Sequence, residues 1–279
     1  MGLNPANTLS DRGFGYDLSY ENAGLRYNPA MGFELREDYT RLGNQVWWAW
    51  LPGEKSKLFS HQVFVRGSVF KKNKDWSTES AEAGLGWKFQ SRTNWGGNIM
   101  YQKFEEGVQE SFTIGDAEIP AGRYQFQGLT SIWNTPWTKP VALFLSTYIG
   151  TFYDGQAATI GVNTNWSPSP SFELTMGYEY NLGEFKDRNE SYKIHLASAK
   201  TTYMFSNALS AALFVQYNND SDEVVTNFRL RYNPREGNDL YIVYNDNLNT
   251  ERSKEFPALP LFSTRALVIK YSYTFTWIR

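Results

Sequence analysis

The chain has 279 residues, of which 41% are hydrophobic, 17% aromatic and 20% charged, and its formal net charge at pH 7 is −2. It contains no cysteine and only two histidines, which excludes disulfides, thiolate metal sites and cysteine nucleophiles and leaves little for a histidine-rich metal centre. A charge so close to zero provides no electrostatic footprint for nucleic acid. We therefore expect no nucleic-acid partner, no metal site and no cofactor.

Apolar and polar residues alternate along most of the chain, which predicts strands rather than helices. In chain order the predicted strands cover residues 13–21, 40–51, 58–71, 78–90, 95–105, 122–133, 141–152, 157–166, 171–182, 192–205, 209–218, 224–232, 239–247 and 264–277. In the last of them Leu267 and Ile269 share one face, whereas Lys270 and Ser272 share the other. All eleven prolines fall between these stretches, as expected of turns, because proline cannot donate a hydrogen bond to a sheet ladder.

The connections between the predicted strands alternate between compact ones and mostly longer ones, and only 153–156 and 219–223 are short among the latter. The compact ones include 52–55, 91–94 and 206–208, and the long ones of opposite parity include 22–39, 106–121 and 248–263. Such alternation is expected of an outer-membrane barrel, which has tight periplasmic turns and longer external loops.

The tryptophans independently indicate the same architecture. Those near the compact turns or the C-terminus are Trp47, Trp48, Trp50, Trp87, Trp95, Trp133, Trp137, Trp166 and Trp277. Only Trp76 lies among the long loops. Interfacial aromatic side chains belong at the level of the lipid headgroups, where an apolar ring and a polar N–H are both satisfied. We therefore predict a tryptophan girdle at one rim.

These features predict an all-β protein, a single antiparallel transmembrane β-barrel of about fourteen strands over residues 1–279, with residues 1–12 as a flexible lead-in. A soluble β-sandwich shows the same alternation. It would not explain tryptophans at one end, or strands about twice as long as the roughly 5–6 residues that are usual in soluble sheets. The expected location is the outer membrane of a Gram-negative bacterium, with the lipid bilayer as partner.

Two stretches are more particular than a generic barrel. They are the segment from Tyr27 to Tyr39 (YNPAMGFELREDY) and the segment from Tyr232 to Asn245 (YNPREGNDLYIVYN). Together with KYSYTF at residues 270–275, they resemble a family of uncharacterised Gram-negative outer-membrane proteins. In that family a periplasmic domain similar to family 9 carbohydrate-binding modules precedes a C-terminal β-barrel of unknown function. The resemblance covers most of the chain, and it implies an outer-membrane location and a carbohydrate-binding or periplasmic partner domain, but no known reaction.

The polar face of each predicted strand would line the lumen of such a barrel. The charged candidates for lumen-lining residues are Arg66, Glu82, Lys88, Glu173, Glu179, Arg229, Arg231 and Lys270. Arg229, Arg231 and Lys270 are expected to neighbour one another. About fourteen strands enclose more space than the eight that side chains can fill. A lumen lined by both signs of charge is therefore expected to be wet, or plugged by a loop.

The loop before the second predicted strand contains Arg36, Glu37 and Asp38. A loop that folds into the lumen is common in barrels, so these residues are a candidate internal latch held by salt bridges. The alternative is a loop whose charges are simply solvated.

The function that these features favour is a passive, porin-like pore for ions or small solutes. The alternatives are a non-conducting membrane anchor or interaction module for a partner domain or protein, and an outer-membrane hydrolase. Catalysis is disfavoured because His61 and His195 are predicted near opposite rims and no Gly-x-Ser-x-Gly elbow occurs. The acidic loop residues 105–106 and 220–223 lack the spacing of a calcium-binding EF-hand loop, so we interpret them as solvated charge.

Overall fold

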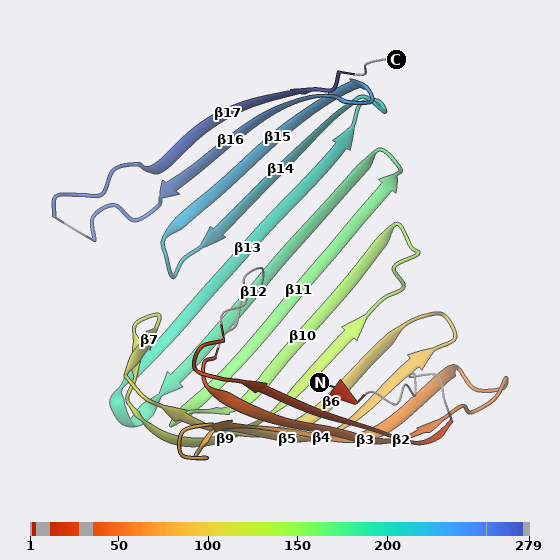
Figure 1. Cartoon of the computed structure of the whole chain (residues 1–279), viewed down its shortest axis with the longest axis vertical. Helices are drawn as coiled ribbons and strands as arrows, with labels where there is room; N and C mark the ends of the chain where they lie inside the picture. Colours follow the sequence, from red (N-terminus) through yellow and green to blue (C-terminus); the bar gives the residue numbers. More distant parts are fainter. Residues whose placement is uncertain (1, 4–11, 28–35, 255, 276–279) are drawn as a thin grey trace. The chain divides into compact units, whose positions relative to one another are not determined.

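The computed structural model describes residues 2–3, 12–27, 36–254 and 256–275, and within them fourteen long strands form one antiparallel sheet (Figure 1). The long strands are β2 (Gly13–Ala23), β3 (Tyr39–Trp50), β4 (Leu58–Lys72), β5 (Thr78–Ser91), β6 (Gly96–Val108), β9 (Gly122–Asn134), β10 (Val141–Phe152), β11 (Gly155–Ser169), β12 (Phe172–Phe185), β13 (Glu190–Met204), β14 (Leu209–Asn218), β15 (Glu223–Arg235), β16 (Asn238–Asn249) and β17 (Phe262–Tyr273). Each is hydrogen-bonded to the long strands that precede and follow it, so the order in the sheet is the order in the chain.

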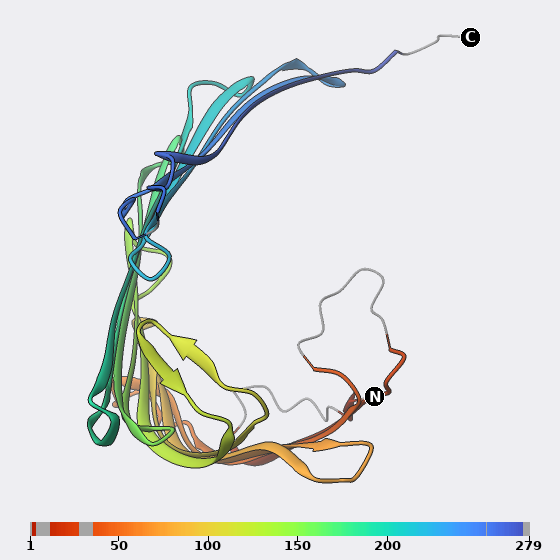
Figure 2. The ribbon, with the colours of Figure 1, turned by 90° about the vertical axis from the view of Figure 1, so that its left-hand side faces the viewer.

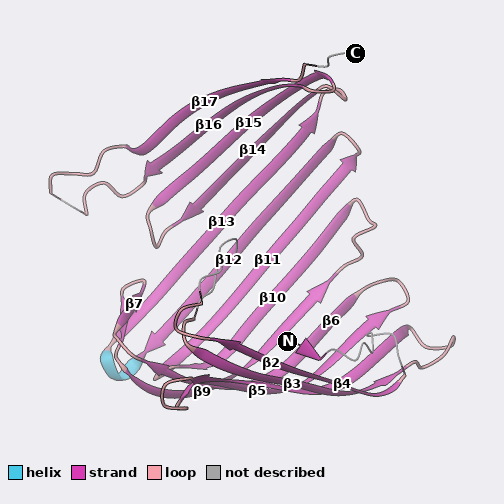
Figure 3. Ribbon diagram, in the orientation of Figure 1, coloured by secondary structure: helices cyan, strands magenta, loops and turns pink. Residues whose placement is uncertain are grey.

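The secondary structure of the described residues also includes four short elements (Figure 3). The two-residue strand β1 (Gly2–Leu3) pairs with β2. Strands β7 (Phe112–Ile114) and β8 (Ala117–Ile119) pair only with each other, as a separate hairpin. The 3-10 helix η1 (Lys186–Arg188) lies between β12 and β13. Among the described residues, no helix has the length and apolar character needed to cross a membrane.

The prediction of an all-β chain with fourteen antiparallel strands is confirmed, and the ends of the strands shift by a few residues. The prediction that no proline lies within a strand is wrong, because Pro168 lies in β11 and Pro234 in β15. The register shifts between Tyr232 and Arg235, so Pro234 occupies an irregularity where its missing N–H interrupts no regular ladder. Segment 106–121, predicted as a loop, contains the β7–β8 hairpin.

The chain divides into two compact units. Unit 1 comprises residues 1–136, 146–159 and 182–192, and unit 2 comprises residues 137–145, 160–181 and 193–279. Strands β10, β11, β12 and β13 contribute residues to both units.

In unit 1 the two faces of the sheet differ sharply in composition. Cross-strand pairing puts Trp47 beside Phe64 and Phe64 beside Gly86, on a face whose other side chains are mostly small or polar. We call it the polar face. A Cβ atom at Gly86 would lie 2.4 Å from the Phe64 ring, so the glycine admits the ring and the ring is buried. The opposite, apolar face exposes Val65 and Leu85, which are 51% and 56% exposed.

The sheet of unit 2 also has one apolar and one polar face, but fewer of its side chains are buried. The register aligns Leu213, Phe228, Tyr244 and Leu267 across β14 to β17 on the apolar face. Every residue of β17 is exposed, and Leu267 reaches 64%. The alternation therefore makes two distinct faces in each unit, as period two requires of a strand.

Three of the tryptophans predicted for the girdle lie exposed on the apolar face of unit 1, and the girdle itself stays a prediction. Trp48 and Trp50 near the end of β3, and Trp133 near the end of β9, are exposed on the apolar face. Trp47 is an exception, because alternation turns it to the polar face, where its ring covers Gly15. Trp277 lies outside the described residues.

Candidate functional site

The polar face of each unit carries the charged residues that the sequence nominated for a lumen. In unit 1 the cross-strand partners of Arg66, Glu82 and Lys88 are Gly84, Ser68 and Gln62, so all three lie on the face of Phe64 and Gly86. In unit 2 a Cβ atom at Gly177 would lie 2.8 Å from the Ser198 hydroxyl. Glu173 and Glu179 alternate with the apolar residues of β12 and so share the face of Gly177.

The basic residues of unit 2 form a small group across three strands. Arg231 on β15 is opposite Tyr241 on β16, which is opposite Lys270 on β17. Arg229 lies on the same face one pair further along β15. The Arg231 guanidinium is 2.8 Å from Asp239 and 5.7 Å from the centre of the Tyr241 ring. The structure thus brings these cations into adjacent rows, with Tyr241 between Arg231 and Lys270.

The β7–β8 hairpin lies over one face of the sheet in unit 1 (Figure 2), where the sequence had indicated only a long loop. Phe112 of the hairpin meets the Tyr153 ring edge-on at 5.9 Å, and Tyr153 in turn lies 5.2 Å from Phe126, which is buried on the polar face. The Tyr124 hydroxyl donates to the carbonyl of Pro120 at 2.8 Å. The hairpin therefore covers part of this face through a stack of aromatic rings.

A sequence signal for this hairpin was present. Gly115 and Asp116 separate two short apolar-rich segments, and glycine followed by aspartate is a pattern of two-residue hairpin turns. Gly115 has φ of 56°, a conformation that glycine adopts without steric cost. Ala117 and Ile119 in β8 are completely buried.

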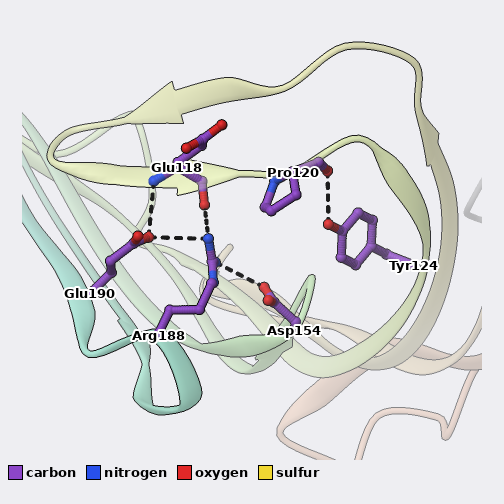
Figure 4. Close-up of polar contacts among 6 residues, drawn as sticks. All are labelled: Glu118, Pro120, Tyr124, Asp154, Arg188 and Glu190. Carbon is purple, nitrogen blue, oxygen red and sulfur yellow. Dashed lines mark hydrogen bonds and ion pairs between the residues drawn. The ribbon is translucent and has the colours of Figure 1, made fainter.

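An arginine from η1 holds the hairpin in place (Figure 4). The Arg188 guanidinium lies 3.0 Å from Asp154 and 3.1 Å from Glu190, and it donates to the carbonyl of Glu118 in β8. The N–H of Glu118 donates to Glu190 at 3.1 Å. Arg188 also lies 4.5 Å from the centre of the buried Phe185 ring. Because its fork of donors reaches three oxygens at once, Arg188 links the hairpin to the turns before β11 and β13.

Tyr153 stands at the centre of the aromatic stack. It occupies the β10–β11 turn with φ of 50°, and its hydroxyl donates to Glu106 at 3.2 Å. Burial raises the pKa of this hydroxyl far above its usual value, and the negative charge of Glu106 and the hydrogen bond to it add to the rise. Tyr153 is therefore a neutral donor throughout the physiological pH range.

The candidate latch is only in part in contact with the sheet. The Arg36 guanidinium lies 3.2 Å from Glu79 and 4.2 Å from the centre of the Phe70 ring. The Asp38 carboxylate accepts a hydrogen bond of 3.2 Å from Asn73. Glu37 is exposed. Residues 28–35 of the same loop lie outside the described residues, and the latch stays a prediction.

A cavity of about 470 Å³ opens on the polar face of unit 1 beside Arg36. Strands β2 to β6 and β9 contribute to its lining, which includes the lumen candidate Glu82. Aromatic walls are formed by Phe70, Phe104 and Phe126. Glu82, a candidate for the lumen lining, and Arg36, a candidate for the latch, therefore line the same cavity.

The two histidines lie among aromatic side chains on the apolar faces. In unit 1 His61 stacks on Trp50 at 5.0 Å and its Nδ1 accepts a hydrogen bond of 3.4 Å from Trp87. In unit 2 the His195 Nδ1 is 2.9 Å from the Tyr178 hydroxyl. Among the residues that the structure describes, no group of three or more histidine, aspartate or glutamate side chains is arranged to hold a metal ion.

No protein-family model matches this chain, and no curated protein matches it either. The resemblance to barrels that follow a carbohydrate-binding-like domain therefore stays a prediction from the motifs at residues 27–39, 232–245 and 270–275.

Proposed function

We propose that the sheet closes into a fourteen-stranded β-barrel in the outer membrane of a Gram-negative bacterium and works as a passive pore for ions or small solutes. Closure would pair the free edge of β17 with the N-terminal edge of the sheet. The polar faces would then line the lumen, and the apolar faces would contact lipid.

The observation that carries the proposal is the row of large apolar side chains exposed on one face of long strands. On β2 these include Phe14, Tyr16 and Leu18, which are 57%, 46% and 53% exposed, and on β17 they include Leu267 and Ile269. Exposed apolar surface of this extent is unfavourable in water, at about 25 cal/mol per Å². A bilayer would cover it, and strands of 10 to 15 residues are long enough to cross the roughly 30 Å hydrocarbon core at a tilt.

Transport would follow from the charges of the polar face. Both signs are represented among the nominated residues, so the wall provides binding partners for cations and for anions. Diffusion down a gradient needs neither a cofactor nor a covalent step, and the width of the lumen and its charged rows would select the solute. The β7–β8 hairpin would narrow the passage from the long-loop side.

Reconstitution of the full chain in planar lipid bilayers tests this proposal. We expect stepwise conductance in KCl, with a reproducible unit size. Heat-unfolded protein added at the same concentration is the control and should give no steps. A chain that inserts into liposomes but never conducts would contradict the pore.

The non-conducting anchor is the second candidate, because the hairpin covers part of the polar face and Arg188 holds it there. Insertion without conductance, together with a stoichiometric partner recovered from native outer membranes, would favour it. Conductance by the isolated chain would exclude it as the sole function.

A further inference from the structure

The cavity on the polar face of unit 1 already contains a cation that belongs to the chain itself. The central carbon of the Arg36 guanidinium lies over the Phe70 ring, 4.2 Å from its centre, and the guanidinium pairs with Glu79 at 3.2 Å. A cation over an aromatic face, held by a carboxylate, is the arrangement by which proteins bind guanidinium and ammonium ligands. Arg36 therefore shows what kind of group this surface accommodates.

The position of Glu79 is part of that arrangement. Phe70 pairs with Ser80, but the next residue of β4, Lys71, pairs with Thr78, so Glu79 is the extra residue of a β-bulge. A bulge changes the direction of a side chain relative to the regular alternation. Here it lets Glu79 meet Arg36 beside the Phe70 ring.

The charge of the lining favours a further cation. The lining includes the glutamates Glu21, Glu82 and Glu106 and the arginines Arg36 and Arg41. Glu105 also belongs to the lining, but it pairs with Ala81, so alternation turns its side chain to the opposite face. Arg41 pairs with Glu21 at 2.8 Å, and Arg123 from outside the lining pairs with Glu105 at 2.7 Å.

Two carboxylates of the lining have no such partner. In the part of the chain that the structure describes, no lysine or arginine forms an ion pair with Glu82 or Glu106. Their hydrogen bonds come from the neutral hydroxyls of Ser68, at 3.4 Å, and Tyr153, at 3.2 Å. The two lie on adjacent strands, since Glu82 pairs with Phe104 and Glu106 pairs with Ser80. Each retains oxygen lone pairs for the N–H groups of a ligand.

We propose that this cavity binds guanidinium-bearing solutes of the size of arginine, and that Arg36 occupies the aromatic position as a built-in competitor. A solute would displace the Arg36 side chain from Phe70 and place its own guanidinium over the ring. Glu82 and Glu106 would accept its N–H groups. The inference deepens the proposed pore by naming a solute class, and it rests on the pore only for the route by which the solute arrives.

Binding by the full chain in detergent micelles tests the site without conductance. Isothermal titration with L-arginine should give saturable binding, whereas L-citrulline, which has a neutral urea in place of the guanidinium, should bind at least about tenfold more weakly. The variant Arg36→Ala should bind L-arginine about tenfold more tightly, because the competing state is removed. Equal affinity for the two solutes would overturn the proposal.

The matched control is Arg41→Ala. It removes the same charge from the same cavity, but the Arg41 guanidinium lies further from Phe70, at 5.7 Å, and is paired with Glu21. If the affinity for L-arginine rose only because the charge of the cavity changed, the rise would be the same in both variants. We expect the affinity of Arg36→Ala to rise several-fold more than that of Arg41→Ala. Equal rises would refute competition by Arg36.

Glu82→Gln keeps the size of the side chain and should weaken L-arginine binding about tenfold. A variant is compared only if its circular dichroism retains the strand signal of the parent chain. Bilayer recordings separate this inference from the pore. Saturable L-arginine binding without conductance would support the site and refute the pore. Conductance without L-arginine binding would support the pore and refute the site.

Discussion

Unit 1 contains nearly all the buried apolar side chains, whereas Ala142 is the one buried apolar residue of unit 2 among those that the structure describes. On the polar face of unit 1, Phe64 fits beside Gly86. On the same face Phe126 packs on Tyr153, which contacts Phe112 of the β7–β8 hairpin. The described strands β14 to β17 of unit 2 form a single layer, with Leu213 and Phe228 on one face and Arg229 on the other. Unit 1 thus buries side chains on its polar face, which unit 2 does not do to a comparable extent, whereas both units expose large apolar side chains on their apolar faces.

The largest expected effect is in the interior of unit 1. Phe185 is 1% exposed and packs against Arg188 and Tyr192. Phe185→Ala should lower the free energy of unfolding by about 3–5 kcal/mol, because it leaves a cavity that the neighbouring strands cannot close. Urea unfolding in lipid vesicles measures the change. Leu267→Ala in the exposed strand β17 is the control, and an equal loss there would erase the contrast between the units.

A somewhat smaller effect is expected on the apolar face of unit 2. Leu230 faces the same side as Phe228 and Tyr232. If that side meets lipid near the bilayer midplane, Leu230→Arg should cost about 2–4 kcal/mol of folding free energy in vesicles. Asn227→Arg places the same charge on the polar face and should cost much less. The reverse order of the two losses would mean that the faces are exchanged.

The smallest effect concerns the covering of unit 1. Arg188→Ala removes two ion pairs and a hydrogen bond to the hairpin, with an expected local loss of about 1–2 kcal/mol because the side chain is largely buried. Proteolysis within residues 109–121 should become faster, and single-channel conductance should rise. Lys254→Ala, which removes an exposed ion pair to Asp222, should change neither. Unchanged proteolysis in Arg188→Ala would show that the aromatic stack alone holds the hairpin.

The strands and their faces could be predicted because the signal is local. Side chains alternate with period two in any strand, so the residue types of 264–273 place Lys270 and Leu267 on opposite faces whatever strand lies beside them. The same argument placed Arg66, Glu82 and Glu179 on polar faces. It misplaced Trp47 in the girdle, because proximity to a turn says nothing about the face of the sheet.

The sequence by itself determined the fourteen strands, the compact turns and the chemical character of each face. Only the tertiary structure decided which segments return over the polar face: the β7–β8 hairpin, Arg188 at its edge, and Arg36 over Phe70. Those contacts join residues tens of positions apart, such as Arg188 and Glu118. They depend on strand register and on a β-bulge at Glu79, and a periodic pattern carries no information about which distant side chain will reach a given ring.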